Sequence, residues 1–301
     1  MTQWALHSIP RPGGVLREQV RALGLSLRGP AAAVAALAAL ATALILSNIL
    51  RGDLAIGFHP ERWILPGLAG ILLPAAVWKG EDRFGPAFLW TLPVDRRGHA
   101  LARVFAGWAW LMAGVALFVL WLLALVLLSG GKLGAEETLG MIPPFPMPGP
   151  ELLDPTTIRA IRWTPDPVLW LVPFTAATAS YLLASAVTLG VRHPLRWIIA
   201  IVLAGFLVAT VSDAADAQGL AELPEDVLQL LFAGRYGLES LLIASTESLK
   251  VETMLPSRER VVVWRGLPDA AQWAAATLLW TAFGLAALWA AASRHGERRR
   301  Q

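Results

Sequence analysis

Long apolar stretches alternate with charged segments along this sequence. Six of the apolar stretches predict transmembrane helices, at residues 31–50, 63–78, 104–128, 168–189, 197–211 and 270–293. The first has twenty residues and no charge, which is the length that an α-helix needs to cross a hydrocarbon core. The second is shorter, contains Pro66 and Pro74, and has tryptophan at both ends, as is typical of the two membrane interfaces. The pattern predicts an all-α fold with six transmembrane helices.

The segments outside the spans differ in character. The first 29 residues hold four arginines that alternate loosely with valine and leucine, which predicts an amphipathic helix on the cytoplasmic surface; a solvated tail is the alternative. Residues 30–301 would then form the six-span domain. Two long loops, 129–167 and 212–269, are predicted to lie outside. The first is rich in proline, and the second has ten acidic residues and two apolar runs that suit short helices at the membrane surface.

The distribution of charge orients this layout in the membrane. With both termini inside, the cytoplasmic segments hold 15 Lys and Arg against 5 Asp and Glu, and the outer segments hold 10 against 17. Lys and Arg gather in the cytoplasmic loops of membrane proteins. The sequence therefore predicts a multi-pass protein of the cell (inner) membrane with both termini in the cytoplasm.

Composition agrees with a membrane protein and excludes several chemistries. Hydrophobic residues make up 56% of the chain and charged residues only 16%, whereas about a quarter of a soluble domain is charged. Because the chain has no cysteine, it has no disulfide, no zinc–thiolate site and no thiol nucleophile. The net charge of +3 is too small and too dispersed to indicate nucleic-acid binding.

The spans also lack the groups that a self-driven transporter or an enzyme needs. No Asp, Glu, Lys, Arg or His lies in the central part of a predicted span, although ion-coupled carriers place such residues at membrane depth. The glycine-rich run at 130–134 lacks the spacing of a phosphate-binding loop. The Ser129 to Lys132 pattern occurs without the other acyl-transfer motifs, and the five histidines include no zinc-binding pair. We therefore expect no enzyme activity, metal or cofactor in this chain.

The charged loop at residues 79–103 contains a short amphipathic run. Phe84, Phe88, Leu89 and Leu92 recur at helical spacing between Gly85-Pro86 and Pro93, which predicts a short helix with one apolar face. A solvated loop would not need that face, although an ordinary cytoplasmic loop is the alternative. An apolar face on a cytoplasmic loop indicates contact with the membrane surface or with a partner protein.

The order of residues in this loop resembles a known family. Glu81, Arg83, Gly85, Leu92-Pro93-Val94 and the basic residues that follow are similar to the loop between the second and third transmembrane helices of ABC-2-type transporter permeases. In that family the loop carries a coupling helix that docks on a separate ATPase subunit. The resemblance implies a membrane-spanning permease subunit, most often of an exporter, that pairs with a second permease and with cytoplasmic ATPases. ATP and Mg would bind those ATPases.

The resemblance also suggests roles for individual residues. The apolar contacts with the ATPase would be Phe84, Phe88, Leu89 and Trp90, and the flanking polar contacts would be Glu81, Arg83, Asp95 and Arg96. A second contact is predicted in the turn between the fourth and fifth spans, at Arg192, His193 and Arg196. Trp108, Trp110 and Trp121 could line a substrate path or serve as interface anchors. The function that competes with transport is a membrane scaffold or assembly protein without an ATPase, and the substrate is left open.

Overall fold

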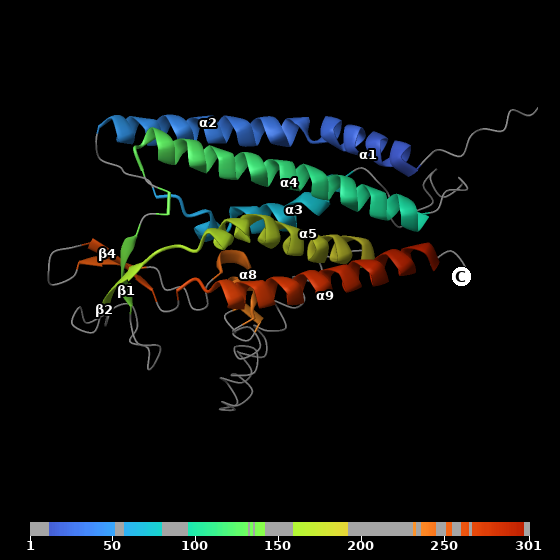
Figure 1. Ribbon diagram of the computed structural model, residues 1–301. Helices are drawn as coiled ribbons and strands as arrows, with labels where there is room; N and C mark the ends of the chain where they lie inside the picture. The colour runs from blue at the N-terminus through green and yellow to red at the C-terminus, as the bar shows by residue number, and fades with distance from the viewer. Residues whose placement is uncertain are drawn as a thin grey trace, which may run out of the picture.

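The structure, a computed structural model, is a bundle of helices with a small sheet at one end (Figure 1). It describes residues 12–51, 57–79, 96–131, 133–134, 136–141, 159–191, 231–232, 236–244, 251–254, 260–264 and 267–297. The chain begins with α1 (Pro12–Ser26), α2 (Arg28–Leu50), the 3-10 turn η1 (Pro60–Arg62), α3 (Leu65–Val77) and α4 (Arg96–Leu128). It continues with η5 (Pro167–Leu171), α5 (Val172–Gly190), α8 (Leu238–Ile243) and α9 (Ala270–Glu297).

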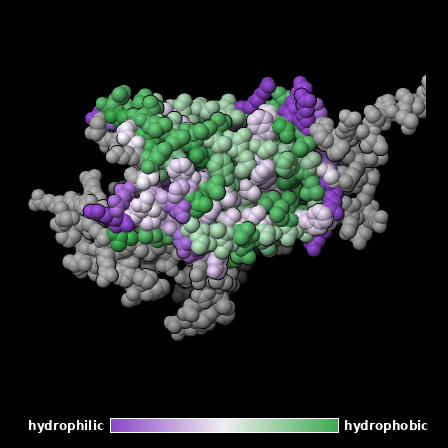
Figure 2. All heavy atoms as spheres, viewed as in Figure 1, coloured by the Kyte–Doolittle hydropathy of each residue, from purple (hydrophilic) through white to green (hydrophobic). Residues whose placement is uncertain are grey.

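Four helices in the described part of the chain are long and apolar enough to cross a membrane. They are α2, α4, the continuous segment of η5 and α5, and α9, and they coincide with the predicted spans at 31–50, 104–128, 168–189 and 270–293. Each contains an apolar stretch long enough to cross the hydrocarbon core, so length and hydropathy together predict it. Figure 2 shows that apolar side chains cover much of the visible surface of the bundle.

The second predicted span differs from these four. Its helix, α3, has only 13 residues, which gives a length of about 20 Å, short of the hydrocarbon thickness of about 30 Å. Pro66 stands in its first turn and Pro74 lies inside it, and proline favours the start of a helix and weakens its interior. The fifth predicted span, 197–211, lies outside the described residues.

The predicted amphipathic helix near the N-terminus is α1, and it continues almost in line with α2 (Figure 1). The backbone N–H of Leu27 donates to the Leu23 carbonyl at 2.9 Å, and that of Ala31 donates to the Leu27 carbonyl at 2.8 Å, so helical hydrogen bonding runs through the junction. Leu23 is buried in the core beside α4. In this structure α1 therefore lies along α4 instead of across the end of the bundle, where a helix flat on the membrane surface would lie.

A four-stranded sheet joins the two segments that were predicted as external loops. Its strands are β1 (Glu137–Met141), β2 (Arg159–Trp163), β3 (Val251–Met254) and β4 (Arg260–Trp264), in the order β2-β1-β4-β3. The outer pairs are antiparallel, whereas β1 and β4 are parallel, with Gly140 opposite Val263. The chain is predominantly helical as predicted, but the all-α class omits this sheet. Because β1 and β2 pair with β3 and β4 in one sheet, the described strands of both segments lie at the same end of the bundle.

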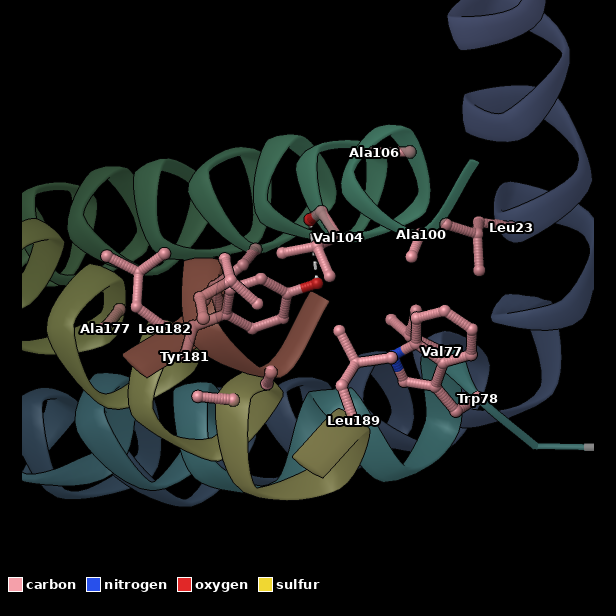
Figure 3. Close-up of a cluster of buried hydrophobic side chains, with 14 of the residues drawn as sticks. Leu23, Val77, Trp78, Ala100, Val104, Ala106, Ala177, Tyr181, Leu182 and Leu189 are labelled. Atoms are coloured by element: carbon pink, nitrogen blue, oxygen red, sulfur yellow. Dashed lines mark hydrogen bonds between the residues drawn. The ribbon is translucent and has the colours of Figure 1, made fainter. Parts of the chain in front are cut away.

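The main core lies where α3, α4 and α5 meet, around the buried side chain of Tyr181 (Figure 3). Two glycines allow the close approach of these helices. A side chain at Gly70 would lie 2.5 Å from the carbonyl oxygen of Ala177 on α5, and one at Gly107 would contact the Tyr181 hydroxyl. Small residues at such crossings are how membrane helices come into close contact. The packing of α3 between α4 and α5 therefore depends on these two glycines.

Candidate functional site

The residues predicted to contact an ATPase lie almost entirely outside the described part of the chain. This applies to Glu81, Arg83, Phe84, Phe88, Leu89, Trp90 and Asp95 and to the second group, Arg192, His193 and Arg196. Arg96 is the first residue of α4, and its side chain is also outside the description. The coupling helix stays a prediction. The structure does describe the residues from which the 80–95 segment leaves the bundle and to which it returns.

These flanking residues form what we call the loop base: Val77, Trp78, Arg97 and Arg103. The guanidinium of Arg103 donates from Nε and from Nη2 to the Val77 carbonyl oxygen, at 2.9 and 2.7 Å. Val77 is the last residue of α3, so a cation binds one of the carbonyls that a helix C-terminus leaves unpaired. The same guanidinium lies 5.4 Å from the centre of the Trp78 ring. The end of α3 is thereby fixed to the first half of α4.

The loop base is also connected to α5. The Tyr181 hydroxyl donates to the carbonyl oxygen of Val104 at 2.9 Å, one residue after Arg103. A Cβ at Gly107 would lie 2.8 Å from Val77 Cγ2 and would also contact the Tyr181 hydroxyl, so these atoms leave no room for a side chain. Figure 3 shows Tyr181, Val104 and Val77 converging between the helices. Any displacement of α3 relative to α4 therefore acts on α5 as well.

A fourth helix contacts the loop base through an aromatic ring. The guanidinium carbon of Arg97 lies 3.5 Å from the centre of the Trp289 ring on α9, within the range of a cation–π interaction. Leu288 and Ala291 of α9 lie in the same core cluster as Val77. The start of α4 is thus held against the end of α9, and the loop base joins α3, α4, α5 and α9.

Two polar groups near the loop base are buried without a hydrogen bond. They are the indole Nε1 of Trp78 and the imidazole Nε2 of His99, neither of which has a partner among the described residues. A buried polar group left unpaired costs about 1–3 kcal/mol. The loop base therefore keeps capacity to bind a polar group supplied by another segment or another protein.

The second predicted contact, at residues 191–196, follows helix α5 in the sequence. Helix α5 ends at Gly190, and a Cβ there would lie 3.5 Å from the Cβ of Ala291 on α9. Leu189 belongs to the core cluster that also contains Val77 and Trp78. The C-terminal ends of α5 and α3, after which the two predicted contacts follow in the sequence, therefore lie close together in the part of the bundle away from the sheet (Figure 1).

The three tryptophans predicted for a substrate path do not converge. Trp108 Nε1 donates to Thr178 Oγ1 of α5 at 3.1 Å, Trp110 Nε1 donates to the Val20 carbonyl of α1 at 2.9 Å, and Trp121 Nε1 donates to Thr42 Oγ1 of α2 at 2.8 Å. Each indole ties α4 to a different helix. Their role in a substrate path stays a prediction, whereas their role in fixing the neighbours of α4 follows from these hydrogen bonds.

The sequence does not predict a cluster of buried charged residues at the sheet end of the bundle. Glu61 of η1 is fully buried; its Oε1 lies 3.2 Å from His59 Nδ1 and 3.7 Å from Arg62 Nε. The guanidinium of Arg62 lies 5.9 Å from the centre of the ring of Trp163, the last residue of β2. The cluster therefore connects the segment before α3 to the sheet. These residues look like ordinary loop charges in the sequence, and no periodicity marks them.

No protein-family model, curated protein or solved structure matches this chain. Within the ranges that the structure describes, no group of three or more His, Asp or Glu could hold a metal ion.

Proposed function

We propose that this chain is the membrane-spanning permease subunit of an ATP-driven transporter of the ABC-2 type, an exporter with six spans. The 79–103 loop would face the cytoplasm and carry a coupling helix for a separate ATPase, which would bind ATP and Mg. A second permease subunit, identical or related, would complete the transporter. The resemblance of the 79–103 loop to that family motivates the proposal.

The observation that carries the proposal is the connection of the loop base to several helices. A coupling segment acts only if its displacement reaches the helices that enclose the transport path. Arg103 fixes the end of α3 to α4, Tyr181 extends this contact to α5, and Arg97 extends it to α9. A force on the 80–95 segment would therefore act on four helices together, as the family's mechanism requires.

The charges support the orientation that the proposal needs. Exposed Arg17 and Arg21 on α1, the arginines of the loop base, and Arg294 on α9 lie at the end from which the 80–95 segment leaves the bundle. The sheet lies at the other end (Figure 1). Its strands come from residues 129–167 and 212–269, two stretches of the sequence that each hold more acidic than basic residues. Basic residues favour the cytoplasmic side, which would place the 80–95 segment within reach of a cytoplasmic ATPase.

The source of energy is the second line of support. The four described apolar helices have no Asp, Glu, Lys, Arg or His between their terminal turns, apart from the basic residues in the first turns of α4. A carrier that uses a proton or ion gradient needs ionisable groups at membrane depth. We therefore propose nucleotide hydrolysis in a partner subunit as the energy source for transport.

The proposal is tested by purification of the tagged chain from native membranes. We expect it to retain an ATPase whose sequence contains a phosphate-binding loop, and we expect Phe88→Asp and Leu89→Asp each to release that ATPase. Leu133→Asp is the matched control, because Leu133 is an exposed apolar residue at the sheet end of the molecule. If the purified chain carries no ATPase, or if Phe88→Asp and Leu133→Asp retain it equally, a membrane scaffold or assembly role replaces transport.

A further inference from the structure

The exposed face of α1 carries a row of arginines. Arg17, Arg21 and Arg28 are all exposed, and they are separated by four and then seven residues, which places them on one side of a helix. The row is continuous across the junction of α1 and α2, because the backbone hydrogen bonds around Leu27 are helical. Within the described part of the chain, none of the three arginines forms an ion pair.

The opposite side of α1 packs against the helix bundle. Leu23 is buried in the core, and Leu16 and Val20 pack against it. The arginine face is therefore held outward by packing on α4, instead of rotating freely as it would on an unattached segment. Figure 2 shows hydrophilic side chains gathered over α1, next to apolar surface of the bundle.

Trp110 marks where this face lies relative to the membrane. Its indole is 42% exposed, rests against Gly24, and donates from Nε1 to the Val20 carbonyl. Tryptophan prefers the interface between hydrocarbon and headgroups, and Leu25, the exposed residue that follows Gly24 on α1, supplies apolar surface beside it. Arg17 and Arg21 flank Val20 along the chain, so they lie at headgroup level. Arg28 is the first residue of α2, and its side chain is long enough to reach back toward the same level.

We propose that this face of α1 binds the phosphate groups of anionic phospholipids in the cytoplasmic leaflet. Three guanidinium groups in a row, which form no ion pair with other described residues, supply hydrogen-bond donors and positive charge for phosphate. Trp110 and Leu25 would contact the acyl chains beside it. Anionic lipid would hold α1 against α4 and thereby limit the motion of α4, the helix that carries Arg97 and Arg103 of the loop base. The inference rests on the orientation given under Proposed function and is independent of any ATPase.

The test uses the full-length chain alone, purified in detergent and titrated with phosphatidylglycerol or phosphatidylcholine. Bound lipid is counted by native mass spectrometry. We expect selective binding of phosphatidylglycerol and a loss of affinity of about fivefold for each arginine removed, hence about 25-fold for Arg17→Gln with Arg21→Gln. Arg17→Lys with Arg21→Lys keeps the charge and should stay within a few-fold of the wild type.

The matched control is Arg51→Gln with Arg162→Gln. It removes two exposed arginines at the sheet end of the molecule and lowers the net charge by the same amount, so phosphatidylglycerol affinity should not change. Equal losses in the two double variants, or no loss in the α1 variant, would overturn the proposal. So would inorganic phosphate that displaces the lipid from the wild type as effectively as phosphatidylglycerol does. If the α1 variant binds lipid normally but releases the ATPase, the face is a protein contact instead.

Discussion

Gly107 offers a direct test of the packing that joins α3, α4 and α5. A Cβ at this position would contact the Tyr181 hydroxyl oxygen and would lie 2.8 Å from Val77 Cγ2. Overpacking of this kind costs about 1–3 kcal/mol. Alanine is also favoured over glycine inside a helix by about 1 kcal/mol, which offsets part of the cost. The net change for Gly107→Ala alone therefore does not measure the contact.

Gly114, on the same helix, is the reference position that separates the helix preference of alanine from the steric cost at position 107. A Cβ there would meet no atom within 4 Å, so Gly114→Ala gains the helix preference without a steric cost. We expect Gly107→Ala to be less stable than Gly114→Ala by about 1–3 kcal/mol. The measurement is the free energy of unfolding by sodium dodecyl sulfate in mixed micelles, followed by the circular dichroism of the helices.

A double variant identifies the atom responsible. Tyr181→Phe removes the hydroxyl oxygen and its hydrogen bond to the Val104 carbonyl, at a cost of about 1 kcal/mol. Because that oxygen also obstructs a Cβ at position 107, Gly107→Ala combined with Tyr181→Phe should lose less than the sum of the two single changes. Equal stability of Gly107→Ala and Gly114→Ala, or strict additivity in the double variant, would refute the packing described for the loop base.

Three further predictions follow from other contacts. Arg103→Gln removes two charge-assisted hydrogen bonds to the Val77 carbonyl and should lower the free energy of unfolding by about 1.5–3 kcal/mol, whereas Arg103→Lys should restore part of it. Gly70→Ala places a Cβ against a carbonyl oxygen of α5 and should destabilise by at least as much as Gly107→Ala, since backbone cannot move aside as a side chain can. Because the chain has no cysteine, a cysteine at Leu133 should react with an impermeant maleimide in intact cells, and one at Arg294 only after permeabilisation; the reverse pattern would invert the orientation.

The sequence predicts the apolar helices well because their signal is local. Helices α2 and α9 each contain a span-length window of high mean hydropathy with almost no charge, so length and hydropathy alone are enough to predict them. The same criterion overestimates α3, since Trp63 and Ile64 extend its apolar stretch although the helix itself begins at Leu65. Element ends depend on backbone geometry, which hydropathy does not report.

The sheet could not be predicted by the same reasoning. Strands β1 and β4 have five residues each, and their pairing joins positions such as Leu139 and Val262. No local pattern encodes a contact between residues so far apart in the chain. Within β4 the run of three valines favours a strand. The strand signal of its partner β1 is weak, because many proline and glycine residues lie around β1 and β2 in the sequence.

The loop base shows a third limit. In the sequence Arg103 is one of several basic residues on the side that is predicted to be cytoplasmic, and Tyr181 is one of two aromatic residues in the apolar helix α5. Their importance comes from the geometry that points one at the Val77 carbonyl and the other at the Val104 carbonyl. Residue type and spacing along the chain do not contain that information. The sequence shows only that Arg103 stands at the edge of an apolar stretch and that Tyr181 stands within one.

A crosslink tests most directly whether the 80–95 segment contacts an ATPase in the cytoplasm. A cysteine at Phe88, in a chain that otherwise has none, would be crosslinked in native membranes with a short bifunctional maleimide, and a cysteine at Leu133 would serve as the control. We predict a crosslinked product that contains the ATPase from Phe88→Cys and none from Leu133→Cys. Labelling of Phe88→Cys from outside intact cells, or a crosslink only from Leu133→Cys, would contradict the account.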